Sequence, residues 1–208
     1  MVYAKLELGS DGKIKGGIDY TLSGYEAVDA RREMDRKEEK TSESDGDTKK
    51  EKSEYQKLEI TFENSTDYAK PLKGKANYNN EEFAEVAGDK IYLNPMLSFK
   101  MKENPLKAEE RKFPVDFAYP FDETYYMNFS IPEGYVVEEL PQSIRTMFED
   151  KTVKFDYLVN NPIANMVQIT CKFSITRALF APEEYKHLKD FFAKIVSKQN
   201  EQIVLKKK

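Results

Sequence analysis

The sequence is poor in the residues from which most reactive sites are built. Its 208 residues include one cysteine, Cys171, and one histidine, His187. A single cysteine excludes an internal disulfide, and one Cys with one His leaves only scattered carboxylates as metal ligands. The glycine-containing motifs GxxxxGK, GxGxxG and GxSxG are absent as well. We therefore expect no metal site and no bound cofactor.

A catalytic Cys-His pair is also disfavoured. Cys171 lies between Ile169 and Phe173 on the apolar side of an alternating run, where burial raises a thiol pKa and blocks access. His187 precedes Leu188 in a helical pattern, on its more polar side. We expect a packed thiol, a surface histidine and no catalytic residue, so an independent cysteine-dependent enzyme is the least favoured hypothesis.

Long apolar runs and an excess of one charge are missing too. No stretch approaches the roughly 20 apolar residues of a membrane helix, and the N-terminus lacks the pattern of a signal peptide. Lysine and arginine total 33 against 37 acidic residues, a net charge of -4. This balance favours neither nucleic acid nor an anionic membrane surface as a partner, and we expect no membrane insertion by this chain.

Aromatic residues, prolines and strand alternation are concentrated in residues 110–141. Alternation of apolar side chains over 125–131 predicts a strand with one buried face. The sequence Ile-Pro-Glu-Gly at 131–134 then predicts a turn and a β-hairpin that restarts at Tyr135. Prolines at 114 and 120 bracket another alternating run, which indicates an edge strand over 113–119.

Two-residue alternation recurs along the rest of the chain. It predicts an N-terminal hairpin, and Asn160-Asn161-Pro162 predicts a turn between the last two long strands. Between Glu81 and Ala87 we expect a short helical turn. The expected strands cover residues 2–8, 14–20, 58–62, 72–78, 89–93, 153–159, 167–176 and, at the end of the chain, 202–205.

Two helices and a polar segment complete the pattern. Ser23 and Glu26 have capping-box spacing, which predicts a short helix from Gly24 to Met34 or a little beyond. Pro182 begins a second, amphipathic helix near the C-terminus. Residues 35–54 contain no apolar side chain, so we expect a solvated helix end followed by a mobile loop.

These patterns predict a mainly β (α+β) protein: an antiparallel, sandwich-like β-fold with a C-terminal amphipathic helix and one short N-terminal helix. The connector around Asn104-Pro105 suggests a boundary. Residues 1–102 would form a β-rich segment with a helix and the charged loop, and residues 103–208 a β-domain with the terminal helix.

Aromatic side chains that alternation leaves on the outer face form the candidate binding surface, which we expect to stack on sugar rings or to anchor a protein partner. Alternatively, a second sheet or a neighbouring domain covers them, because alternation alone does not say which face is inside. These residues are Tyr119, Phe121, Tyr126 and Tyr135.

A family resemblance suggests a setting. The run NPLKAEERKFPVDFAYPFDETYYMNFSIPEGYVVEELP and the end FAPEEYKHLKDFFAKIVSKQNEQIVLKK resemble the C-terminal region of bacterial multidomain transglutaminase-like proteins. GKIKGGIDYTLSGYEAVDARREM is similar to the segment that follows their papain-type core. The family's catalytic residues belong to that core, which would precede residue 1, so none is assigned here. The acidic loop at 35–54 departs from the family pattern.

The resemblance implies a non-catalytic accessory or interaction domain, located C-terminal to a transglutaminase-like core in the periplasm or at the cell surface. It would position substrate for that core, or dock a protein or glycan partner. A carbohydrate-binding β-sandwich module is the alternative. The full strand that begins at Val2 also leads us to expect that the chain is part of a larger protein.

Overall fold

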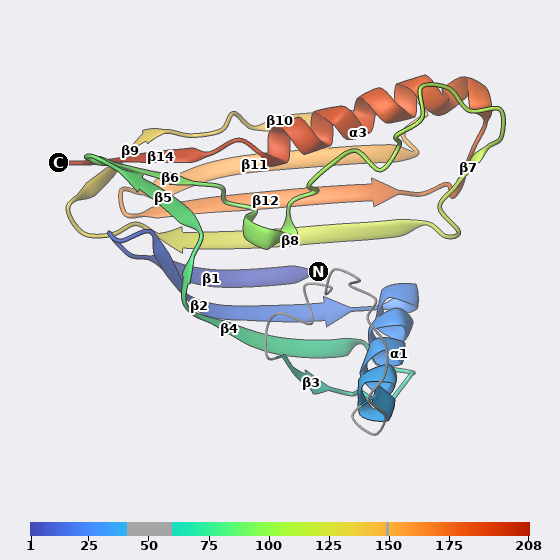
Figure 1. Cartoon of the computed structure of the whole chain (residues 1–208), viewed down its shortest axis with the longest axis horizontal. Coiled ribbons are helices and arrows are strands. Elements are labelled where there is room, and N and C mark those ends of the chain that lie inside the picture. Colours follow the sequence, from blue (N-terminus) through green and yellow to red (C-terminus); the bar gives the residue numbers. More distant parts are fainter. Residues whose placement is uncertain (41–59, 149) are drawn as a thin grey trace.

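The computed structural model describes residues 1–40, 60–148 and 150–208, which form mainly β structure with antiparallel sheets and a C-terminal helix (Figure 1). This confirms the predicted fold class. The elements are β1 (Val2–Leu8), β2 (Lys13–Leu22), α1 (Gly24–Lys40), β3 (Thr61–Glu63), β4 (Leu72–Glu82), β5 (Ala84–Ala87), β6 (Lys90–Leu93), η1 (Leu97–Phe99), β7 (Val115–Asp116), β8 (Phe121–Ser130), β9 (Tyr135–Glu139), β10 (Ile144–Met147), β11 (Val153–Ile163), β12 (Met166–Ile175), β13 (Leu179–Phe180), η2 (Pro182–Glu184), α3 (Tyr185–Gln199) and β14 (Ile203–Lys207).

The large sheet has eight strands in the order β10-β11-β12-β8-β1-β2-β4-β3. Neighbours are antiparallel except β1 and β8, which pair in parallel with Val2 opposite Tyr125. This pairing joins residues from both sides of the boundary expected at residue 102. The sheet therefore has no break at that point, and the two halves share one hydrophobic core.

A smaller sheet has the order β5-β6-β14-β9, and β7 pairs only with β13. The prediction of a hairpin around residues 131–134 is wrong, because the strands on either side, β8 and β9, do not pair with each other. The chain turns there, with Gly134 at φ 82° and the Tyr135 N–H donating to the Pro132 carbonyl, but β9 then pairs with β14. The reason is that β12 and β1 already occupy both edges of β8.

Other local predictions need correction. Residues 81–87 form the end of β4 and all of β5 rather than a helical turn. The turn expected at 160–162 is absent, because β11 continues through an irregularity to Ile163 before β12 begins at Met166. Helix α1 continues to Lys40, and the remainder of the expected mobile loop lies outside the described residues.

The core lies on one face of the large sheet. Helix α3 lies over the half formed by β10, β11 and β12, whereas α1 lies by the ends of β2 and β4 (Figure 1). The smaller sheet reaches the β1–β2 turn, where the Ala84 N–H donates to the Gly12 carbonyl at 3.2 Å. From α3, Leu188, Phe192 and Ile195 are buried against the sheet. The spacing of these residues explains why the sequence forms an amphipathic helix here. In the described part of the chain, no helix is both long enough and apolar enough to cross a membrane.

Candidate binding surface on the open face of the large sheet

The opposite face of the large sheet, called the open face below, consists of the side chains that alternate with the buried ones. It is polar, and its basic residues outnumber its acidic ones although the whole chain is acidic. Its charged members include Lys5, Lys15, Lys73, Lys75, Arg145, Lys154 and Lys172, with Glu7, Asp19, Glu63, Asp122 and Asp156.

Two tyrosines lie side by side near the middle of this face. Tyr3 on β1 is opposite Tyr126 on β8 in the parallel register, and Tyr3 is 44% exposed. The Lys172 ammonium lies 5.9 Å from the centroid of the Tyr126 ring. A cation at this distance from a ring gives a weak attraction, about 0.5–1 kcal/mol at an exposed position. The three side chains therefore form one amphipathic patch, called the tyrosine patch below.

An ordered row of amides borders the tyrosine patch. Gln168 Nε2 donates to Asn128 Oδ1 at 2.9 Å, and Asn128 Nδ2 donates to the Ala4 carbonyl at 3.1 Å. These bonds hold the two amides in fixed orientations, so less side-chain entropy is lost when a partner binds against them.

The structure separates the four aromatic residues predicted from the sequence. Tyr126 lies on the open face, but Phe121 lies on the inner face, where its ring packs edge-on against Phe173 at 5.3 Å. An odd separation along one strand places two residues on opposite faces, which the sequence interpretation overlooked. Tyr119 stacks on Tyr25 at 4.4 Å, beside α1. Tyr135 is half-buried in the smaller sheet, so the four do not form one surface.

Sequence reasoning missed Tyr3 and Lys172 as neighbours of Tyr126. The alternation around each residue indicated an outward side chain. No local pattern indicated that β1 and β12 lie on either side of β8, which is what brings the three together.

Cys171 and His187 lie in different parts of the molecule. Cys171 is fully buried on the inner face, its Sγ accepts a hydrogen bond from Gln199 Nε2 at 3.5 Å, and burial raises its pKa to about 12. His187 is exposed on α3. The buried thiol and surface histidine expected from the sequence are thus confirmed. Within the described ranges, no cluster of three or more His, Cys, Asp or Glu has a geometry that could hold a metal ion.

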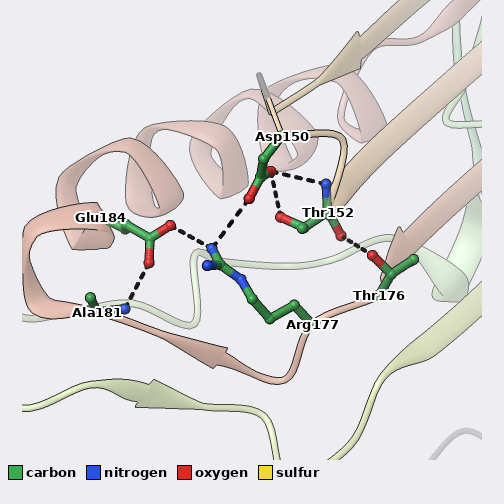
Figure 2. Close-up of polar contacts among 6 residues, drawn as sticks. All are labelled: Asp150, Thr152, Thr176, Arg177, Ala181 and Glu184. Atoms are coloured by element: carbon green, nitrogen blue, oxygen red, sulfur yellow. Dashed lines mark hydrogen bonds and ion pairs between the residues drawn. The ribbon is translucent and has the colours of Figure 1, made fainter.

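An ionic cluster joins the end of β12 to the start of the C-terminal helix (Figure 2). Arg177 pairs with Glu184 and, at 3.5 Å, with Asp150 Oδ2. Asp150 also accepts hydrogen bonds from the Thr152 hydroxyl and backbone N–H, which together with Arg177 lower its pKa. For Glu184, partial burial raises the pKa, but the bonds from Arg177 and the Ala181 N–H outweigh it and the net shift is downward. Both carboxylates are therefore ionised near neutral pH, and their bonds to Arg177 and to the Ala181 N–H hold the start of the helix next to the end of β12.

Comparison with known proteins places the chain in one family. No curated protein and no solved structure matches it. The family model described as "Domain of Unknown Function with solved-structure structure (DUF3858)" matches residues 89–205, from the start of β6 through most of β14 and more than half of the chain. The protein therefore belongs to the DUF3858 family.

Proposed function

We propose that this protein is a non-catalytic accessory domain that docks through its open face onto a transglutaminase-like, papain-type core in the same polypeptide and helps to position that core's substrate. The resemblance of residues 104–141 and 180–207 to the tail of such proteins supports this setting. The same resemblance supports a location in the periplasm or at the cell surface.

The observation that carries the docking proposal is the asymmetry of the large sheet. The core, α3 and the smaller sheet all lie on the inner face, whereas on the opposite face Tyr3 is exposed and Tyr126 is partly exposed. Tyrosine is enriched among residues that dominate binding energies, because it buries a large ring at low entropic cost. The excess of lysine on this face suits an acidic partner surface.

A supporting rather than a catalytic role is favoured by the state of the thiol. The attacking species in cysteine chemistry is the thiolate, and a pKa of about 12 leaves Cys171 protonated near neutral pH. Its burial also denies access to a substrate.

The proposal is tested by titrating this chain with a separately produced transglutaminase-like core from the full-length protein, using calorimetry. Tyr126→Ala is expected to weaken binding by about 1–2 kcal/mol, roughly tenfold, as for a typical anchor residue. Lys172→Glu is also expected to weaken binding, and by a larger factor at low ionic strength, where charges are screened less. Lys186→Glu, on an exposed position of α3, is the matched control and should change nothing. Wild-type binding that none of the open-face variants alters refutes the docking surface.

A carbohydrate-binding role is the second candidate, favoured by the adjacent Tyr3 and Tyr126 rings. Tyrosine rings stack on the apolar faces of sugars, and neutral sugars carry no charge for Lys172 to attract. Titration with neutral cell-surface oligosaccharides therefore distinguishes the roles. Binding that requires Tyr126 but tolerates both Lys172→Glu and high salt supports the glycan role, whereas salt-sensitive binding of the core supports the accessory role.

A further inference from the structure

A groove separates the edge strand β10 from helix α3, at the margin of the large sheet and away from the tyrosine patch. It has a volume of about 590 Å³. One wall is the end of β10 with its following residue, and the other is a stripe of α3 at helical spacing. The lining residues are Thr146, Met147, Phe148, Asp150, Glu184, His187, Asp190, Phe191 and Lys194, and the set is called the β10–α3 groove below.

The outer edge of β10 offers backbone hydrogen-bonding groups to the groove. β10 pairs with β11 on one side and, within the described ranges, with no strand on the other. The Phe148 N–H donates to the Val153 carbonyl of β11 at 2.9 Å. In an antiparallel pair, alternate residues direct their N–H and C=O groups toward the partner strand. Thr146, like Phe148, therefore faces β11 with these groups, whereas Arg145 and Met147 direct theirs away from β11.

The groove has an apolar floor and a negative rim. The rings of Phe148 and Phe191 meet edge to face at 5.3 Å, and Met147, whose side chain shares the open face with Lys154, is 53% exposed at the mouth of the groove. Asp190 on α3 adds a third carboxylate to those of Asp150 and Glu184 at the end of the groove. Among the described residues that line the groove, Lys194 is the only lysine. Arg177 offsets part of this charge at that end.

We propose that the β10–α3 groove binds an extended, basic peptide segment, which adds a strand to β10 and places alternate apolar side chains on the Phe148–Phe191 floor. An unpaired strand edge beside a helix supplies what strand addition requires: outward backbone groups for affinity and a side-chain groove for specificity. The carboxylates select lysine or arginine in the peptide over acidic residues.

The test uses a defined probe, the blocked heptapeptide Lys-Thr-Val-Thr-Val-Thr-Lys, titrated into the ¹⁵N-labelled full chain. Its lysines and valines occupy odd-numbered positions, so all of them point to the groove side of an added strand. We expect saturable shifts at β10 and α3 with a Kd of roughly 1 mM or tighter. Met147→Pro deletes one outward N–H while sparing the pairing to β11, because proline is tolerated at such edge positions. It should weaken binding about fivefold or more, the equivalent of one hydrogen bond. Asp190→Lys should weaken it further.

Controls separate strand addition from attraction to charge. A peptide with glutamate in place of lysine, and one N-methylated on alternate amides, should not bind. Lys5→Glu on the open face should leave binding unchanged, so a failure here is distinct from a failure of the proposed docking. Equal binding of the N-methylated peptide, no binding by a folded wild type, or self-association that Met147→Pro abolishes would each overturn the proposal.

Discussion

Arg31 joins helix α1 to the loop before β4, and its replacement gives a sharp test of the structure. The side chain belongs to a residue only 3% exposed. Its guanidinium donates to four backbone carbonyls at 2.9–3.0 Å, those of Asn64, Ser65, Asp67 and Lys70. A fixed planar fork of donors suits this convergence, because no other side chain presents so many.

The cost of losing this contact follows from counting donors. Nε and Nη2 carry three hydrogens for the four oxygens, so at least one hydrogen is shared. At about 1 kcal/mol net for each hydrogen, the bonds contribute about 3 kcal/mol. The guanidinium carbon also lies 4.9 Å from the Tyr68 ring centroid, which adds about 0.5–1 kcal/mol. Arg31→Met should therefore lower the free energy of unfolding by about 3–4 kcal/mol.

Urea unfolding followed by circular dichroism measures this free energy, and hydrogen exchange of α1 amides detects opening of the helix alone. The matched control is Arg32→Met, because Arg32 is an exposed neighbour that forms an i,i+3 pair with the exposed Asp29. It should cost less than about 0.5 kcal/mol. If Arg31→Met lowers neither the global nor the local stability by more than about 1 kcal/mol, the contact does not hold α1 in place.

Three further results are expected. Cys171 should resist thiol reagents at pH 8 in the native protein and react fully once unfolded; rapid native labelling would contradict its burial. Burial, followed by the charge of Glu26, raises the pKa of Glu123, so the folded state binds the proton more tightly and stability falls as pH rises above 4.5, the ordinary glutamate value. Glu123→Gln should therefore raise Tm at pH 8 but not near pH 4; an equal effect at both would show that ionisation is not the cause. Gly16→Ala, which sets a Cβ 2.2 Å from the Lys5 carbonyl oxygen at φ 140°, should cost about 3 kcal/mol or more. Gly17→Ala meets only the Asn77 side chain at 3.6 Å and should cost under about 1 kcal/mol in the same urea assay; equal losses would contradict the β1–β2 register.

Local patterns in the sequence were sufficient for most elements. Alternation of buried side chains predicts β1, β2, β8 and β12, and amphipathic spacing predicts α3. Both patterns involve residues close together in the chain, so they can be recognised from the sequence alone. The sequence does not predict β10, because its four residues, Ile144–Met147, are too few and too mixed in polarity to show a clear alternation. The sequence predicts a helical turn at 81–87, and this prediction is wrong because the extended pairing of β5 with β6 has no local signal.

The candidate surface was less accessible to sequence reasoning. Alternation correctly separates inner from outer side chains over residues 124–130 of β8, and the same alternation, continued back along the strand, shows that Phe121 and Tyr126 face opposite ways. It could not show that Tyr3 lies beside Tyr126, since these residues are brought together by a parallel pair separated by more than a hundred residues. The β10–α3 groove depends in the same way on the packing of α3 against a distant strand edge.

The amino-acid sequence by itself determined which side chains enter the core, where most strands and helices begin, and that the only thiol lies among them, because side-chain period and turn chemistry act over a few residues. The tertiary structure alone decided that β8 lies between β1 and β12, that β9 pairs in the smaller sheet, and that the described helices and the smaller sheet pack on one face of the large sheet. Strand order depends on which edges are already occupied, and that is a property of the whole assembled sheet.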